Sequence, residues 1–340
     1  MSLLVVEQLA IRYGDDAAVD GISFAIERGE SVGLVGESGS GKSQTALAIM
    51  GLLPGNASIA GSIRFDGEEL SGKSQRQLNR FRAQRIGMVF QDPMQALNPF
   101  LTIGAQLSRI LLQHRIADGA GARQRVVDML ARVELPDPER QYSAYPHELS
   151  GGMRQRAMIA SALLAGPDLL IADEPTTALD VTVQAQIMEL LAELQEQYNT
   201  AIILITHDLG VVADVADEVA VMYAGRLVER GTLDDIFYSP EMPYTVGLLS
   251  SVPRLDAVSE RLTPIPGQPP SLINLSPGCV FHPRCTARSL VPGDRCATER
   301  PDLIQVTSTH AVRCHLEQEQ RETFAAESLA AVTGADGGVA

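Results

Sequence analysis

Eight consecutive residues near the amino terminus have the composition of a phosphate-binding loop. They are Gly36, Glu37, Ser38, Gly39, Ser40, Gly41, Lys42 and Ser43, and they fit the pattern G-x-x-x-x-G-K-S. Glycines allow backbone angles that point several N–H groups at one anion, and a helix beginning near Lys42 adds the positive end of its dipole. We expect Lys42 to bridge the β- and γ-phosphates of a nucleotide and the Ser43 hydroxyl to ligate Mg²⁺.

A second candidate site stands at the end of the apolar run over residues 169–172, which is followed by Asp173 and Glu174. Asp173 is expected to hold Mg²⁺ directly or through water, and Glu174 could polarise an attacking water as a general base. Strands also end in acidic residues that only cap the next element. After a phosphate-binding loop, the catalytic interpretation is favoured, so the pair of motifs predicts nucleotide hydrolysis.

The elements that must position these motifs alternate through about the first 250 residues. Segments rich in branched apolar residues predict strands at residues 3–11, 22–26, 31–35, 86–90, 169–172 and 201–206. Helical segments are predicted at residues 43–50 and 181–198. The order strand, Gly-rich loop, helix is typical of a parallel sheet with crossover helices, so the fold class is α/β, of the P-loop NTPase kind.

Two regions depart from this alternation. Residues from about 101 to 160 show mostly helical spacing, which predicts an inserted helical subdomain. Beyond residue 253, five prolines at positions 264, 266, 269, 270 and 277 exclude a long helix or a central strand. We therefore predict an ATPase domain over residues 1–252, a cysteine-bearing extension over 253–316 and a disordered tail, rich in Ala, Glu and Gly, over 317–340.

Composition and charge exclude several classes of protein. The 340 residues carry a net charge of −15, which disfavours nucleic-acid binding because phosphate backbones require clustered Lys and Arg. The most apolar stretch, residues 157–172, contains Pro167 and Asp168 and is too short to cross a bilayer. The first residues, MSLLVVEQ, lack the basic segment of a signal peptide. We expect a cytosolic protein, unless a partner holds it on a membrane.

Residues 149–156, LSGGMRQR, resemble the signature sequence of the ATPase subunits of ABC transporters. Ser150 and two glycines would open a helix and form a second anion site there. In that family, two ATPase domains pair head to tail, and each signature closes on the ATP of the other subunit. The resemblance assigns the following residues to the partner's ATP: Leu149, Ser150, Gly151, Gly152 and Gln155.

The same resemblance implies roles for single residues elsewhere. Gln91 matches the glutamine that senses Mg²⁺ and faces the transmembrane partner. The implied Mg²⁺ ligands are therefore Ser43, Gln91 and Asp173. His207 matches the switch histidine at the γ-phosphate, so the implied catalytic residues are Glu174, His207 and Gln91. Ala178, Leu179 and Asp180 match the loop that couples the two ATPase subunits. Tyr13 matches the aromatic that stacks on adenine, and Gln44 completes the implied ATP-binding set.

Every cysteine lies in the extension, at positions 279, 285, 296 and 314. Residues 264–267, PIPG, and 278–285, GCVFHPRC, resemble the C-terminal extension of oligopeptide/dipeptide (and nickel) permease ATPases. Four thiolates can hold a [4Fe–4S] cluster or a tetrahedral zinc. Without a C-x-x-C pair, the long irregular gaps favour the cluster formed by Cys279, Cys285, Cys296 and Cys314; zinc, free thiols and a disulfide are the alternatives. His282, His310 and His315 are expected to be bystanders.

The function implied by the resemblance is ATP-driven, Mg²⁺-dependent import of di- and oligopeptides, at the cytoplasmic face of the bacterial inner membrane. The implied partners are a second ATPase subunit in a heterodimer, two transmembrane permease subunits and a periplasmic or lipid-anchored substrate-binding protein, with no nucleic acid. Import of nickel or glutathione by the same machinery is the alternative. A non-transport ABC ATPase and a module that holds ATP without cleaving it are less favoured.

Overall fold

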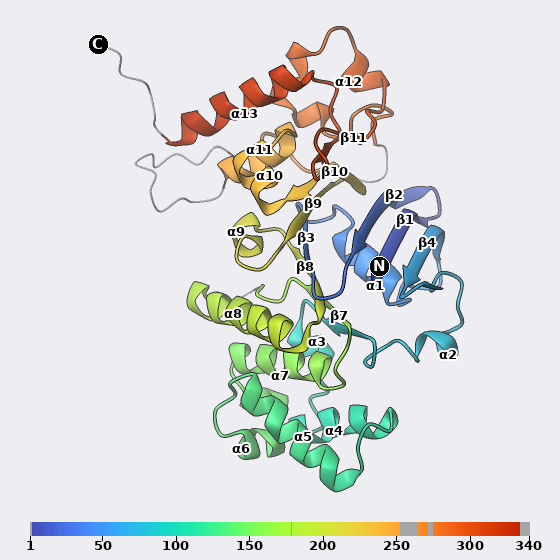
Figure 1. The fold of residues 1–340 in the computed structure, drawn as a ribbon, viewed down its shortest axis with the longest axis vertical. Coiled ribbons are helices and arrows are strands. Elements are labelled where there is room, and N and C mark those ends of the chain that lie inside the picture. The colour runs from blue at the N-terminus through green and yellow to red at the C-terminus, as the bar shows by residue number, and fades with distance from the viewer. Residues whose placement is uncertain (1, 178, 252–263, 271–274, 334–340) are drawn as a thin grey trace.

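The computed structural model describes residues 2–177, 179–251, 264–270 and 275–333. Within these ranges the strands form two sheets (Figure 1). The smaller sheet is antiparallel, in the order β2-β1-β4-β5. Its strands are β1 (Leu4–Tyr13), β2 (Asp16–Ile26), β4 (Ala57–Phe65) and β5 (Glu68–Glu69).

The larger sheet has eight strands in the order β11-β12-β10-β9-β3-β8-β7-β6. They are β3 (Ser31–Val35), β6 (Ile86–Val89), β7 (Leu169–Asp173), β8 (Ala201–Thr206), β9 (Glu218–Tyr223), β10 (Arg226–Thr232), β11 (Ile304–Gln305) and β12 (Ala311–Val312). Strand β3 pairs in parallel with β8 and β9, and β7 pairs in parallel with β6 and β8. The residues that follow β3, β6, β7 and β8 therefore meet at one edge of the sheet.

Alternation along β3 explains why both faces of the larger sheet are covered. Val32 and Leu34 join a core shared with the smaller sheet and with α1 (Lys42–Ile49), whereas Val35 faces the opposite core. That second core includes side chains from α7 (Gly151–Leu163), α8 (Val181–Tyr198) and α9 (Leu209–Val212). Near-continuous apolar strands are the expected consequence of burial on both faces.

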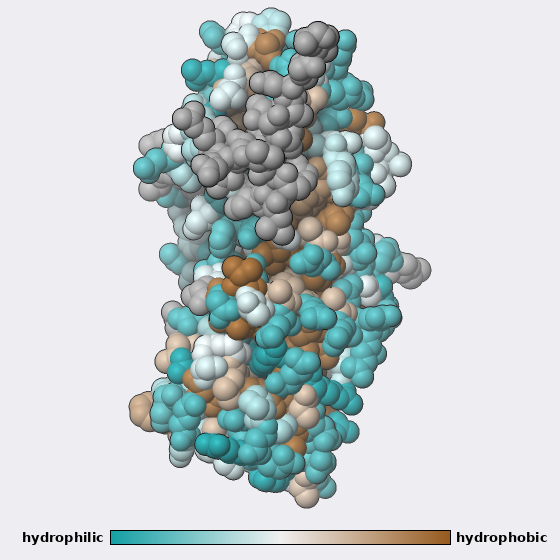
Figure 2. Space-filling view, turned by 90° about the vertical axis from the view of Figure 1, so that its left-hand side faces the viewer, coloured by the Kyte–Doolittle hydropathy of each residue, from teal (hydrophilic) through white to brown (hydrophobic). Residues whose placement is uncertain are grey.

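Residues 101–160 are largely helical, as the sequence predicts. They contain α4 (Ile103–Gln113), α5 (Gly119–Arg132), α6 (Pro138–Ser143) and a 3₁₀ turn at Pro146–Glu148, ahead of α7. Helices α4 to α6 lie at the lower end of the molecule in Figure 1, and Figure 2 shows that end to be mostly hydrophilic on the face it presents. Their apolar stripes point inward, because Ile103, Leu107 and Leu111 of α4 are fully buried.

The remaining helices, apart from α13 (Gln318–Thr333), are short. They are α2 (Gln75–Leu78), α3 (Pro93–Ala96), α10 (Leu233–Tyr238), α11 (Pro243–Ser250), α12 (Arg295–Thr298) and the 3₁₀ turns His282–Arg284 and Thr286–Leu290. In the described part of the chain, no helix combines the length and the apolar character that crossing a bilayer requires.

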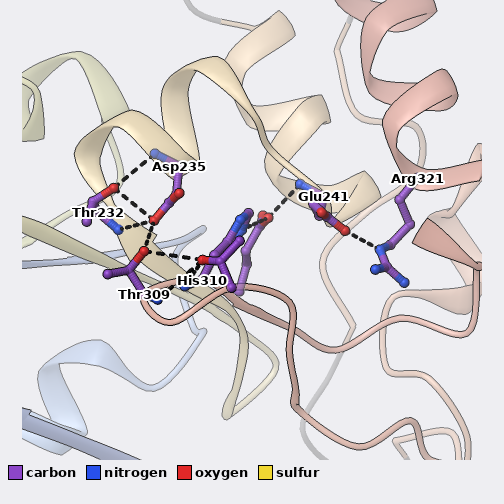
Figure 3. Close-up of polar contacts among 8 residues, drawn as sticks. Thr232, Asp235, Glu241, Thr309, His310 and Arg321 are labelled. Atoms are coloured by element: carbon purple, nitrogen blue, oxygen red, sulfur yellow. Dashed lines mark hydrogen bonds and ion pairs between the residues drawn. The ribbon is translucent and has the colours of Figure 1, made fainter. Parts of the chain in front are cut away.

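The extension is continuous with the larger sheet. Strand β12 pairs antiparallel with β10, and β11 pairs with β12. Figure 3 shows the polar contacts beneath this junction. The Nε2 atom of His310 lies 2.8 Å from Oε1 of Glu229, an oxygen that also accepts from the Glu241 N–H at 2.6 Å. Thr309 donates to Oδ2 of Asp235 at 2.9 Å. The junction therefore couples the extension to β10 through a buried polar pair and to α10 through an exposed hydrogen bond.

The predicted disorder of residues 317–340 is wrong over the segment that forms α13 (Gln318–Thr333); residues 334–340 lie outside the described residues. Ala, Glu and Gln are strong helix formers, so the composition suits a helix as well as a coil. Arg321, buried on α13, pairs with the buried carboxylate of Glu241, and Ala325 packs inward (Figure 3). These contacts come from residues about 80 positions apart, which composition does not reveal.

Candidate active site

The loop at residues 36–43 connects β3 to α1 and requires its glycines. A Cβ atom on Gly36 would lie 2.1 Å from the carbonyl oxygen of Met222, and one on Gly41 would lie 2.6 Å from that of Ala18. Gly41 also has a φ of 101°, which side chains disfavour. The loop thus packs directly against the backbones of β2 and β9, and any larger residue at these two positions would displace it.

Lys42 is only 4% exposed and lies inside the loop. Its Nζ donates to the carbonyl oxygens of Gly36 at 2.6 Å and Glu37 at 3.0 Å. Burial lowers the pKa of Lys42, and the nearby carboxylates of Glu174, Asp173 and Glu37 partly offset this effect. The ammonium group is therefore held at the mouth of an anion-binding loop, where phosphate oxygens are its natural partners.

Ser43 and Asp173 form the candidate Mg²⁺ site. The Ser43 hydroxyl donates to Oδ1 of Asp173 at 2.9 Å, although the two residues are 130 positions apart. Asp173 is 5% exposed, and its pKa is raised by burial and further by the neighbouring Glu174, while the Ser43 hydrogen bond acts in the opposite direction. A hydroxyl and a carboxylate are oxygen ligands of the type that Mg²⁺ prefers, so this pair fits the ion.

Glu174 is held by residues from three other segments. Its Oε2 accepts from Nε2 of Gln91 at 2.9 Å and from the Thr177 hydroxyl at 2.8 Å, and its Oε1 lies 3.4 Å from Nδ1 of His207. The backbone of Glu174 adopts a φ of 46°, which is uncommon for a residue with a side chain. Its N–H donates to the carbonyl of Ile205 on β8 at 2.8 Å, which fixes this conformation.

The structure thus brings the implied catalytic residues Gln91, Glu174 and His207 together; the His207 side chain is 58% exposed and that of Glu174 is 14% exposed. Thr177 was missed in the sequence. Its role comes from the hydrogen bond that its hydroxyl donates to the Glu174 carboxylate, which no sequence pattern signals.

Gln91, Glu174 and residues of the phosphate-binding loop line a cleft of about 390 Å³, a size suited to a small-molecule ligand. Its lining comprises Tyr13, Ala18, Ser38, Gly39, Ser40, Gly41, Lys42, Ser43, Gln44, Gln91 and Glu174. The Tyr13 hydroxyl donates to Oε1 of Gln44 at 2.5 Å, and burial raises the pKa of Tyr13. An adjoining cleft of about 700 Å³ shares Ser38, Gln91 and Glu174 with it, adds Glu37 and His207, and is walled by residues of α11 and the extension.

The predicted signature residues do not line either of these clefts. Ser150 is the N-cap of α7 and accepts from the N–H of Met153 at 3.3 Å. Ser150 and Gly151 are exposed and Gly152 is half-buried, whereas Leu149 and Gln155 face the interior. The assignment of Leu149 and Gln155 to a partner's ATP stays a prediction: Leu149 packs in the core, and the Nε2 of Gln155 is buried without a hydrogen-bond partner.

Asp180 of the predicted coupling loop is the N-cap of α8. Its Oδ1 accepts from the N–H of Val183 at 2.9 Å. Leu179 lies beside the signature, because a Cβ atom on Gly151 would be 3.8 Å from its Cδ2 atom. Ala178 lies outside the described residues. The signature and the coupling loop thus share one surface, separate from the chain's own phosphate loop.

The four cysteines are all free thiols, from fully to partly buried. Burial raises the pKa of both Cys285 and Cys314 to about 12, and it also raises that of Cys279 and Cys296. Among the residues that the structure describes, no group of three or more His, Cys, Asp or Glu side chains is arranged to hold a metal ion. The predicted cluster or zinc site is therefore unsupported by the geometry.

Sequence and structure comparisons agree with this arrangement. Residues 19–177 match the family described as ABC transporter, and residues 228–290 match the one described as oligopeptide/dipeptide transporter, C-terminal region. The oligopeptide transport ATP-binding protein OppD of Escherichia coli (strain K12) is 54% identical over 288 residues, which are 84% of this chain and 86% of that protein. The dipeptide transport ATP-binding protein DppD of Bacillus subtilis (strain 168) is 50% identical, covering 94% and 96%.

Two solved structures share the fold. The structure of cbiO1 from Clostridium perfringens, part of the ABC transporter complex cbiONQ, has a TM-score of 0.62 and 33% identity, and the match covers 70% of this chain and 91% of that one. The ATP-binding cassette MJ0796, in a dimeric post-hydrolysis state bound to ADP and Pi, has a TM-score of 0.61 and 29% identity, with coverages of 68% and 98%. On this similarity, the chain belongs to the ATP-binding proteins of ABC transporters, in the oligopeptide/dipeptide transporter family.

Proposed function

We propose that this chain binds ATP and Mg²⁺, hydrolyses ATP, and thereby energises an ABC importer that takes up di- and oligopeptides. The observation that carries the proposal is the convergence of Lys42, Ser43, Asp173, Gln91 and Glu174 at one sheet edge. The relatives named above are oligopeptide and dipeptide transport ATP-binding proteins, and this supports the choice of cargo.

Each residue of the convergence has a distinct task. The loop N–H groups and the Lys42 ammonium bind the phosphates, and Tyr13 supports the adenine ring. Ser43 and Asp173, with Gln91, hold Mg²⁺, which supplies charge neutralisation at the phosphates when bound. Glu174 orients a water and takes its proton, while His207, which lies 3.4 Å from Glu174, would contact the γ-phosphate. A chain that only held ATP would have no use for a carboxylate aligned in this way.

A second ATPase subunit completes the site. Ser150 and Gly151 are exposed at the start of α7 and lie apart from the chain's own cleft, which supports their use on the nucleotide of a partner subunit. Asp180 lies on the same surface, at the start of α8. We assign the head-to-tail pairing to this face, with a heterodimer as the expected form.

Permease subunits are the expected partners of the segment on either side of Gln91, residues 90–100. Phe90, Met94 and Phe100 expose 39%, 52% and 86% of their surface there, and exposed apolar side chains of this size mark contact sites. Two transmembrane subunits docked on this segment would hold the ATPase on the cytoplasmic face of the bacterial inner membrane. A periplasmic or lipid-anchored binding protein would deliver the cargo on the other side.

The test is ATP-dependent uptake by vesicles that contain this chain with its partner ATPase and permease subunits. We expect a labelled di- or oligopeptide to accumulate. The accumulation should require ATP on the side of the membrane that carries the ATPase subunits, and it should stop when Glu174 is replaced by Gln. Accumulation of nickel or glutathione instead would show that the cargo is different and that the transport mechanism is the one proposed. ATP hydrolysis without transport of any of the three would favour a non-transport ATPase.

A metal at Cys279, Cys285, Cys296 and Cys314 is the part of the proposal that the geometry does not support. Metal and sulfide analysis of anaerobically purified protein decides it. Iron with sulfide and visible absorption would establish a cluster, and zinc without colour would establish a structural zinc site. Four alkylatable thiols in metal-free protein would exclude both and agree with the neutral, buried thiols described above.

A further inference from the structure

Arg284 of the extension reaches the phosphate-binding loop. It belongs to the motif FHPRC of residues 281–285, which the hydrolysis reaction leaves unexplained, and it is only 7% exposed. Its Nη1 and Nη2 donate to the two carboxylate oxygens of Glu37 at 2.5 and 3.0 Å. Glu37 is the second residue of the loop and lies 247 positions earlier in the chain. A paired contact of this kind fixes both orientation and distance.

Aromatic rings and a carbonyl hold Arg284 in this position. Its Nε donates to the carbonyl of Pro266 at 2.8 Å, and its Nη1 lies 3.3 Å from the Tyr223 hydroxyl. The rings of Tyr223, Tyr244 and Phe281 pack together, with centroids 4.6 to 5.3 Å apart. Such packing leaves the guanidinium little freedom to leave Glu37.

Every polar group of Glu37 has a hydrogen-bond partner. Its N–H donates to the Tyr244 hydroxyl at 2.8 Å. Its carbonyl accepts from Nζ of Lys42 at 3.0 Å and from the N–H of Ser40 at 3.2 Å, which closes a turn over residues 37–40. Because that turn carries the tip of the phosphate-binding loop, a residue that immobilises Glu37 also immobilises the groups that meet the phosphates.

Loss of the Arg284 side chain is expected to destabilise the turn over residues 37–40. The Glu37 carboxylate is largely buried, so removal of its cation leaves a charge without compensation and favours movement of the loop toward solvent. A loop that must be ordered again on each binding event binds its ligand more weakly, even when no contact with that ligand has been removed.

We propose that Arg284 is a positioning residue for ATP: the extension holds the phosphate-binding loop in its binding conformation through the Arg284–Glu37 pair. This inference rests on the proposed function, since it assumes that the loop binds ATP. It assigns the extension a direct part in nucleotide affinity, in addition to its packing against the sheet.

The experiment compares Arg284→Met with Arg300→Met in the full-length protein assembled with its partner ATPase. Arg300 is a matched control, because it is also an extension arginine paired with a core carboxylate, Asp20, but does not approach the loop. We expect Arg284→Met to raise the KM for ATP and the Kd of a non-hydrolysable ATP analogue about tenfold, with kcat changed less than about twofold. Arg300→Met should change neither constant.

Three further measurements separate this inference from general damage. Arg284→Lys should recover part of the affinity, because it keeps the charge but loses the paired geometry. Glu37→Gln should reproduce the loss without touching the extension, and the double variant Glu37→Gln/Arg284→Met should be no worse than either single one. Should Arg284→Met prove misfolded by circular dichroism, Glu37→Gln and Arg284→Lys still decide the matter.

The two proposals fail in different ways. Wild-type protein that does not bind ATP would refute the proposed function. Wild-type protein that binds ATP, with unchanged affinity in Glu37→Gln and in the folded Arg284 variants, would refute the positioning role alone. A fall in kcat at unchanged KM for ATP in Arg284→Met would also refute the positioning role, because the loop would then still hold its ATP-binding conformation without Arg284.

Discussion

At the scale of single residues, the site depends on how Glu174 is held. Its backbone is in the left-handed region, its N–H is bound to β8, and its carboxylate receives Gln91 and Thr177. Residues in sparsely populated backbone regions persist where the surroundings fix them, and they occur often at active sites. The carboxylate is therefore placed by its neighbours before any nucleotide enters the cleft.

The first prediction follows from this placement. Glu174→Gln keeps the size of the side chain and one acceptor oxygen, which can still receive Gln91 and Thr177, but removes its ability to accept a proton. We expect turnover of ATP to fall about a hundredfold or more, with ATP affinity unchanged. Steady-state hydrolysis and equilibrium binding are the measurements, and Glu189→Gln, an exposed change on α8, is the control. Hydrolysis near the wild-type rate would remove Glu174 from the role of base.

Lys42 should act at the binding step instead. Lys42→Ala removes the buried ammonium that the loop encloses, and hydrogen bonds to charged groups contribute about 1.5–3 kcal/mol. The Kd for ATP should therefore rise about 10- to 100-fold, as measured by calorimetry. Lys73→Ala, which breaks a pair with Glu68 away from the cleft, should leave the Kd unchanged. Intact affinity in Lys42→Ala would contradict the assignment of Lys42 to the phosphates.

At the scale of elements, strand ends bring the site together. Strands β3, β6, β7 and β8 each contribute the residues just beyond their carboxyl ends, and parallel pairing sets those ends side by side. The start of α7 stands apart from this edge, so one chain carries two half-sites that face different directions. This separation gives the signature helix a role that can be tested in trans.

Gly151→Asp is the informative change on α7. A Cβ atom at this position meets only Leu179 at 3.8 Å, so the folded monomer tolerates the side chain. Across a paired interface, the new carboxylate would face the γ-phosphate of the partner's ATP, where like charges repel. We expect normal ATP binding by the isolated subunit and loss of the ATP-dependent pair in size-exclusion chromatography. Gly119→Asp, at an open position on α5, is the control. Weak binding by the isolated variant would count against head-to-tail pairing.

Elements with a strong local pattern could be predicted from the sequence. Strands β3 and β8 and helix α8 have the predicted bounds, because their apolar spacing and their boundaries are both local signals. The site residues of the loop and of the strand ends were predictable for the same reason. Helix α13, the burial of Gln155 and the pair between Arg284 and Glu37 were not, since each depends on contacts between residues distant in the chain.

At the scale of the whole molecule, the extension and the ATPase core form a continuous structure. Strand β12 lies against β10, α13 packs on α11, and the contacts of Figure 3 join the two across buried polar groups. His310 and Glu229 are the centre of that junction and are both almost fully buried. A titratable pair in this position makes the attachment of the extension sensitive to pH.

The direction of this sensitivity follows from the pKa of His310. Burial alone would lower that pKa, but the hydrogen bond to Glu229 and the carboxylates of Glu229, Asp235 and Glu241 outweigh it, so the pKa is raised above its ordinary 6.5. The charged form is therefore stabilised by folding, by about 1.4 kcal/mol for each pKa unit. This contribution is fully present below pH 6.5 and is lost as the pH rises through the raised value.

We therefore expect the attachment of α13 to weaken between neutral and mildly alkaline pH. Hydrogen exchange of α13 amides, measured from pH 6 to pH 9 and corrected for intrinsic rates, should show this loss of protection. His310→Gln should be less protected at pH 6 and should lack the pH dependence, whereas His147→Gln, an exposed change, should behave as wild type. A flat profile in the wild-type protein would refute the linkage.

The pairing of β12 with β10 has a consequence for shortened forms of this protein. Without residues 304–312, β10 would be the outermost strand of the larger sheet, with free N–H and C=O groups along it and a buried Glu229 deprived of His310. An unprotected outer strand is a template for pairing with other chains. A premature stop codon just before residue 304 would thus yield insoluble aggregates in place of a slightly smaller ATPase, and the segment that carries β11 and β12 would prove indispensable for solubility.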